Sequence, residues 1–161
     1  MGLKQDRPTR ESRSNGNPRM DVRDKGLCRD ASIDDLSTQE LGGLGESLAC
    51  FYLEERGYEV LQRNYRCPEG EADIVAFDEQ DDSVVLIEVK TRRQLGRGEL
   101  YPEEAVNKKK RRRYRRIAAH YALEHHPVRA IRFDVIAINI HEGRTAGIQH
   151  ILGAFDRDAD R

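Results

Sequence analysis

The sequence predicts a single α/β domain in which a central mixed sheet is flanked by two long helices. Two segments carry apolar residues at helical spacing, whereas five shorter segments are continuously apolar or alternate between apolar and polar residues. Their order along the chain is α-β-β-β-α-β-β, with no internal repeat. The length of 161 residues suits one domain of ordinary size. We therefore expect one α/β domain over residues 37–161.

The first 36 residues differ in composition from the rest of the chain. They mix Arg, Asp, Ser and Asn with few large apolar residues. Such a segment buries too little apolar surface to offset the entropy that is lost on ordering. We predict a disordered, mixed-charge extension over residues 1–36.

The predicted elements follow one another from Thr38 onward. Thr38 is the expected N-cap of the first helix, which ends at Gly57 because glycine commonly stops a helix. The run from Val84 to Ile87 makes the third strand the strongest strand prediction. The expected strands are 58–66, 71–77, 83–91, 131–140 and 148–152, and the second helix is expected over 103–124.

The composition argues against several classes of protein. The longest aliphatic runs are about four residues long, whereas a membrane helix needs about 20 apolar residues. Three cysteines without a C-x-x-C motif predict neither a disulfide framework nor a zinc site. The first 36 residues lack the apolar core of a secretory signal. We expect a cytoplasmic protein with free thiols and no membrane partner.

The formal net charge of -1 conceals a strongly basic region. Residues 90–116 contain twelve basic and three acidic side chains, and eight of the nine residues 108–116 are basic. A solvated helix face is one interpretation, but the density of charge favours contact with the phosphates of a nucleic acid. The residues expected to bind nucleic acid are Arg92, Arg93, Lys108, Lys109, Lys110, Arg111, Arg112 and Arg113.

A hairpin between the second and third strands would bring two carboxylates together. If Phe77 faces Val84 in an antiparallel hairpin, Asp73, four residues before Phe77, lies opposite Glu88, four residues after Val84. Like charges at directly opposed positions destabilise a sheet. A hard divalent cation, Mg²⁺ or Mn²⁺, would offset this repulsion, since it binds carboxylate oxygens together with water and phosphate.

Lys90 lies two residues after Glu88 and therefore on the same face of its strand. An ammonium there can orient a metal-bound water or stabilise negative charge on a phosphate. The pattern D-x(n)-E-x-K alone is weak in a chain with 35% charged residues. The alternative is a surface ionic network in which Lys90 pairs with Glu71. Asp134 is expected either in a polar network or on a solvent-facing strand surface, and the five histidines as structural or exposed residues.

Six short motifs occur in order along residues 41–140. They are Gly45-Glu46, Arg63 to Arg66, Gly70 to Ala76, Ile87 to Arg92, Glu104 to Val106, and Arg132 to Val135. This series resembles the bacterial YraN family of endonuclease-like proteins. That family is similar to the PD-(D/E)XK nucleases, including the archaeal Holliday-junction resolvases, which implies a restriction-endonuclease-like core.

The resemblance implies a role for each site residue. Asp73 and Glu88 would be metal ligands, and Lys90 would be the catalytic lysine. Glu46 matches a helix carboxylate that helps some relatives bind metal, and Lys110 matches a family lysine that faces the same cleft. The alanine before Asp73 replaces the proline of the superfamily's name.

These observations together predict a Mg²⁺-dependent or Mn²⁺-dependent endonuclease that acts on nucleic acid, expected to be DNA. Two alternatives belong to other classes. One is a nucleic-acid-binding module that keeps the fold but does not cut, and the other is a scaffold whose basic helix binds an acidic protein. Junction-cutting relatives are often dimers, so a homodimer is a further expectation.

Overall fold

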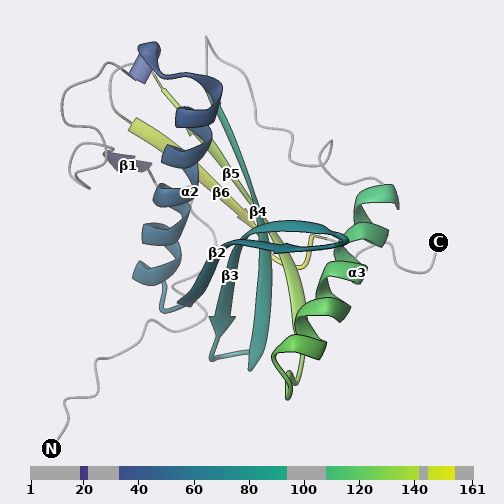
Figure 1. Ribbon diagram of the computed structural model, residues 1–161. Coiled ribbons are helices and arrows are strands. Elements are labelled where there is room, and N and C mark those ends of the chain that lie inside the picture. The colour runs from purple at the N-terminus through teal and green to yellow at the C-terminus, as the bar shows by residue number, and fades with distance from the viewer. Residues whose placement is uncertain (1–18, 22–32, 94–107, 142–144, 155–161) are drawn as a thin grey trace, which may run out of the picture.

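The computed structural model describes residues 19–21, 33–93, 108–141 and 145–154. Figure 1 shows a twisted central sheet with one long helix on each side. The elements are β1 (Arg19–Asp21), the short 3-10 helix η1 (Ile33–Asp35), α2 (Thr38–Glu55), β2 (Glu59–Cys67), β3 (Gly70–Asp78), β4 (Ser83–Arg93), α3 (Lys108–Glu124), β5 (Ile131–Ile140) and β6 (Thr145–Ile151).

The sheet has six strands in the order β1-β6-β5-β4-β3-β2. Strands β4 and β5 run parallel, and every other neighbouring pair is antiparallel. The parallel connection passes through α3, which covers the face of the sheet opposite to α2 (Figure 1). The predicted mixed sheet flanked by two helices is confirmed, and the arrangement is compatible with a restriction-endonuclease-like core.

Two apolar layers hold the helices against the sheet. Strand β5 shows the alternation, since Phe133 and Val135 face α3 whereas Ile136 and Ile138 face α2. The α2 side also contains Leu48 of the helix, and the α3 side contains Ile117, both with no exposed surface. Burial on both faces explains why β4 and β5 read as nearly continuous apolar runs.

The N-cap of helix α2 lies one residue before the predicted one. Ser37 has an extended backbone, and its hydroxyl accepts a hydrogen bond from the backbone N–H of Glu40. The Glu40 carboxylate accepts a hydrogen bond from the Ser37 N–H in return, which completes a capping box. Thr38 already lies in the helix, so the prediction that it caps the helix was wrong. Gly57 follows the helix end with a φ of 81°, as a stop residue requires.

The second predicted helix is observed from Lys108 to Glu124, and its predicted first turn, residues 103–107, lies outside the described residues. No helix in the described ranges combines the length and apolar character that crossing a bilayer requires. Strand β5 has the predicted bounds, whereas β4 extends two residues further, to Arg93, and β6 begins at Thr145.

Two short elements within residues 1–36 were not predicted. Strand β1 pairs with the edge of β6, and its Met20 is buried in the α2 layer. The η1 turn is held by Arg93, whose Nη2 donates hydrogen bonds to the backbone carbonyls of Ile33, at 2.9 Å, and Leu36. These contacts join the start of α2 to the end of β4.

A buried ionic network lies on the α2 side of the sheet. Asp134 has no exposed surface and accepts hydrogen bonds from Arg132 at 2.9 and 3.0 Å. Nε2 of His150 lies 2.8 Å from the same carboxylate, and Arg132 also binds Asp78 and Asp81. A solvent-facing Asp134 is therefore excluded, and His150 has a structural contact. Burial alone would raise the pKa of Asp134, but His150 and Arg132 lower it below its ordinary value.

Candidate metal and phosphate site

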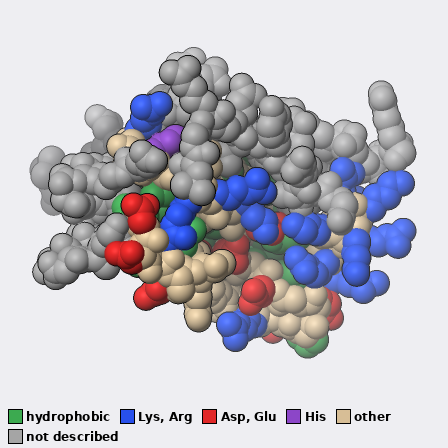
Figure 2. Space-filling model, turned by 90° about the horizontal axis from the view of Figure 1, so that it is seen from above, with side chains coloured by type: hydrophobic (Ala, Val, Ile, Leu, Met, Phe, Trp, Pro, Cys, Tyr) green, Lys and Arg blue, Asp and Glu red, His purple; other side chains and the backbone are tan. Residues whose placement is uncertain are grey.

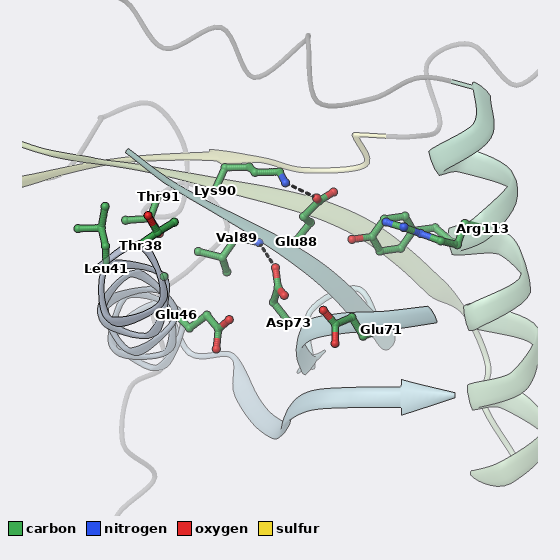
Figure 3. A pocket seen from close by; sticks show the side chains of 12 residues that line it. Thr38, Leu41, Glu46, Glu71, Asp73, Glu88, Val89, Lys90, Thr91 and Arg113 are labelled. Atoms are coloured by element: carbon green, nitrogen blue, oxygen red, sulfur yellow. Dashed lines mark hydrogen bonds and ion pairs between the residues drawn. The ribbon is translucent and has the colours of Figure 1, made fainter. Parts of the chain in front are cut away.

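A pocket of about 420 Å³ opens where β3 and β4 separate. Its walls come from the first half of α2, the start of β3, the end of β4 and the first half of α3. Figure 3 shows the carboxylates of Asp73 and Glu88 between the two helices. The pocket is therefore formed by both helices and by the two strands of the predicted hairpin.

The hairpin register agrees with the prediction up to the pocket. Phe77 lies opposite Val84 and Val75 opposite Leu86. The recorded pairing ends with Ile74 opposite Ile87, one residue before the predicted pair of Asp73 and Glu88. Beyond this point Oδ2 of Asp73 accepts a hydrogen bond of 2.8 Å from the backbone N–H of Val89. A side chain thus replaces a strand-to-strand backbone contact, which lets the strands separate.

Glu88 is the most buried charged residue of the pocket, with 8% of its side chain exposed. Its Oε1 lies 2.7 Å from Nζ of Lys90 and 3.6 Å from Nζ of Lys110. Its Oε2 is buried and has no hydrogen-bond partner among the described residues. A buried carboxylate oxygen without a partner is costly, and a bound cation would remove that cost.

Asp73 carries a strongly perturbed carboxyl group. Its pKa is raised to about 6, chiefly by burial; the negative charges of Glu46, Glu88 and Glu71 contribute to the rise, while the Val89 N–H acts in the opposite direction. Loss of water and crowding by carboxylates both disfavour the ionised form. A divalent cation would reverse this balance by attracting the same charges.

Glu46 reaches the pocket from α2. Figure 3 shows its side chain directed toward Asp73, and its Oε2 lies 3.5 Å from a guanidinium nitrogen of Arg63. The preceding Gly45 is buried against β4, and a Cβ at that position would overlap Oγ1 of Thr91 and lie 2.8 Å from its Cβ. Glycine therefore allows the close approach of α2 that brings Glu46 to Asp73.

Tyr114 lines the pocket and also belongs to the apolar layer under α3. It is 2% exposed and packs edge-on against Phe133. Burial raises the pKa of its hydroxyl, as do the charges of Glu88 and Asp73 and a hydrogen bond with the Glu88 carboxylate. The spacing of four residues from Lys110 was the available signal, since residues i and i+4 share a helix face.

The residues predicted to bind nucleic acid occupy different positions. Arg113 lines the pocket, Lys110 reaches Glu88, and Arg92 is exposed near the end of β4. Figure 2 shows Lys and Arg side chains gathered over the end of the molecule that carries α3. Exposed or half-buried on α3 are Lys108, Lys109, Arg111 and Arg112.

Arg93 differs from the other basic residues because its guanidinium is used within the protein. It binds the carbonyls of Ile33 and Leu36, which lie just before α2. The structure therefore gives Arg93 an anchoring contact and does not place it in the pocket.

The donor set fits a divalent cation held by two carboxylates. Within the described ranges, no three His, Cys, Asp or Glu side chains already surround a common point at metal-binding distance. Mg²⁺ commonly takes one or two carboxylates, with water and substrate phosphate completing its shell. Asp73 and the unpartnered oxygen of Glu88 meet that need, and Glu46 lies beside them.

Comparison with known proteins groups this chain with a set of bacterial sequences. Residues 45–138 match the family described as "Uncharacterised protein family UPF0102". The chain is 43% identical over 115 residues to a UPF0102 protein of Renibacterium salmoninarum, covering 71% of this chain and 94% of the relative. It is 45% identical over 117 residues to one of Rhodococcus opacus, covering 71% and 95%. It is 43% identical over 122 residues to one of Moorella thermoacetica, covering 74% and 98%.

Proposed function

The chain belongs to the UPF0102, or YraN, family, and from its site we propose that it is a metal-dependent nuclease that hydrolyses phosphodiester bonds of DNA in the bacterial cytoplasm. The observation that carries this proposal is the buried carboxylate of Glu88. One of its oxygens contacts Lys90, while the other has no partner among the described residues. Asp73, with its raised pKa, lines the same pocket. This combination suits a cation and a phosphate together.

Asp73 and Glu88 would hold Mg²⁺ or Mn²⁺, and Glu46 would support the ion from α2. When bound, such an ion lowers the pKa of water and stabilises charge on a phosphoryl oxygen. The Lys90 ammonium donates hydrogen bonds to the attacking water or to a phosphate oxygen. Its contact with Glu88 keeps the ammonium at the reacting centre.

Phosphates on either side of the reacting one would lie along α3. Arg113 at the pocket wall and the exposed Lys109 and Arg112 extend the positive surface away from Glu88. Contacts of this kind hold the backbone and carry no sequence information. We therefore expect recognition of the backbone and of nucleic-acid structure.

A second function, binding without cleavage, is favoured by one specific observation. The ammonium of Lys90 already lies 2.7 Å from Glu88, and that of Lys110 lies 3.6 Å away. Two lysines can neutralise the buried carboxylate without a metal ion. In that case the pocket and α3 bind phosphate, but no water is activated.

Cleavage of a labelled panel distinguishes these functions. The panel contains single-stranded, duplex, flapped and four-way-junction DNA and single-stranded RNA, with Mg²⁺, Mn²⁺ or EDTA. Metal-dependent cutting that falls by about 100-fold or more in Glu88→Gln supports the nuclease. Glu59→Gln, on the exposed edge of β2, is the matched control and should cut normally.

Binding without any metal-dependent cutting would identify the non-catalytic module. Equal cutting by wild type and Glu88→Gln would mean that the activity does not come from this site. Weak binding of every member of the panel at low salt would contradict both functions.

A further inference from the structure

Helix α2 contains glycines that its own packing does not explain. A Cβ at Gly42 or at Gly43 would meet no atom of the described residues within 4 Å, in contrast to Gly45, which is pressed against Thr91. Each interior helical glycine costs about 1 kcal/mol relative to alanine. Neither of the first two glycines is therefore required by a neighbouring side chain.

Gly42 and Gly43 differ in their relation to the pocket. Gly42 lines it, together with Thr38 and Leu41 of the same helix, whereas Gly43 is exposed and is not part of the lining. The same pocket contains the buried, unpartnered Oε2 of Glu88. Open space over a glycine at the rim of such a pocket is space that a ligand can occupy against the helix backbone.

The two walls of the pocket are chemically different. On the α2 side, Leu41 and Gly42 present apolar and backbone surface beyond the Glu46 carboxylate, while on the α3 side Arg113 presents a guanidinium. A nucleotide has the same division, because its phosphate is anionic and its sugar and base are neutral with apolar faces. The positive wall suits the phosphate, and the α2 wall suits the sugar or the base.

We propose that Gly42 is the point at which one strand of the nucleic acid passes against the backbone of α2, with its sugar or base on this helix and its phosphate toward Arg113. This inference rests on the proposed function and adds a second contact surface to it. The volume of about 420 Å³ lies near the lower end of the range for ligand pockets. It therefore holds the reacting phosphate and its immediate neighbour, while the rest of the strand lies outside.

Gly42→Leu and Gly43→Leu form a matched pair for the test. Both place the same side chain in open space on the same helix, and both should raise Tm because leucine favours helix more than glycine does. Only the leucine at position 42 enters the pocket. Binding of a fluorescent single-stranded oligonucleotide, measured by anisotropy in EDTA, should weaken about tenfold in Gly42→Leu and stay within about twofold in Gly43→Leu.

The panel's best substrate gives a second readout, since the Michaelis constant should rise in Gly42→Leu and not in Gly43→Leu. If Gly42→Leu lowers Tm, the pair Gly42→Ala and Gly43→Ala repeats the comparison with the smallest side chain, and a loss of about threefold is expected at position 42 alone. The comparison uses the leucine pair or, if Gly42→Leu lowers Tm, the alanine pair. Equal binding by the position-42 and position-43 variants would overturn this inference while leaving the nuclease proposal intact. Failure of the wild type to bind any nucleic acid would overturn the proposed function, and this inference with it.

Discussion

The backbone N–H of Val89 donates a hydrogen bond of 2.8 Å to the carboxylate of Asp73, across the point where β3 and β4 part. This bond orients the carboxylate and also ends the strand pairing, which stops at Ile74 and Ile87. The next residue after Val89 is Lys90, and the preceding one is Glu88, so one strand carries two of the charged groups around a single backbone contact. The geometry of the pocket therefore depends on Asp73 in two ways, through charge and through strand separation.

Asp73→Asn should stabilise the protein at neutral pH in the absence of metal. The pKa of Asp73 is raised to about 6, so its ionised form is unfavourable in the folded state. The variant should therefore gain about 1–2 kcal/mol in free energy of unfolding at pH 7.5, and the gain should shrink as the pH falls from 6 and vanish below about 4. Urea unfolding at a series of pH values measures this.

The direction of this stability change follows from whether the carboxyl binds its proton more tightly in the folded or in the unfolded state. A carboxyl whose folded pKa exceeds its unfolded pKa favours folding when protonated and opposes it when ionised. Glu59→Gln, at an exposed position of β2, serves as the control and should change little. A constant difference between Asp73→Asn and wild type across pH 4–8 would contradict the assignment.

Divalent cations should raise the Tm of the wild-type protein at pH 7.5. A ligand at 100 times its Kd stabilises by about 2.7 kcal/mol, which corresponds to roughly 5–10 °C for a domain of this size. Glu88→Gln should lose this response, because it loses the buried charge. The response should also fade at pH 5, where Asp73 holds a proton that a cation must displace. An unchanged Tm shift in Glu88→Gln would place the bound cation elsewhere.

Much of this pocket follows from local sequence rules. Alternation fixes the faces of a strand, so the register that pairs Phe77 with Val84 also directs Asp73 and Glu88 to one surface. Lys90 shares that face for the same reason. The spacing of four residues likewise places Lys110 and Tyr114 on the same side of α3. The alternation along a strand, the register of a short hairpin and the spacing along a helix all involve residues that are close in sequence, so they can be predicted from the sequence.

Contacts between distant segments were beyond such rules. Arg132, Asp134 and His150 combine only because β5 pairs with β6 and α2 covers them both. Arg93 was grouped with the phosphate-binding residues because a sequence gives the sign of a charge but not its partner. The Ser37 cap was different, because Ser37 and Glu40 form the local S-x-x-E pattern of a capping box, one residue earlier than the predicted cap.

Gly45→Ala should destabilise the protein by about 1–3 kcal/mol, despite the better helix propensity of alanine. The added methyl would overlap Thr91, so α2 must move away from β4 and carry Glu46 with it. Gly43→Ala is the control and should be neutral or stabilising, since its Cβ would meet no atom within 4 Å in the part of the chain that the structure describes. Urea unfolding of both variants gives the comparison. Thr91→Gly in the Gly45→Ala background should recover most of the loss, and no recovery would argue against the contact as the cause.

Arg132→Met should cost about 3–5 kcal/mol in free energy of unfolding. It leaves Asp134 and Asp78 buried without their guanidinium partner. Arg129→Met removes an exposed ion pair with Asp82 and should cost less than about 1 kcal/mol. Thermal or urea unfolding at pH 7 distinguishes the two. Similar losses in both variants would mean that burial of the network contributes little.

Arg112→Gln and Arg93→Gln should affect different properties, although both remove one positive charge from the same basic region. Arg112 is exposed on α3, so its loss should lower the slope of log K against log salt by about 0.9 for duplex DNA. Arg93 holds the carbonyls of Ile33 and Leu36, so its loss should lower Tm and leave the salt slope unchanged. Anisotropy titrations at several salt concentrations, beside melting curves, measure both. If Arg93→Gln lowers the slope as much as Arg112→Gln does, its guanidinium also contacts phosphate in the complex, and the contacts before α2 must open when nucleic acid binds.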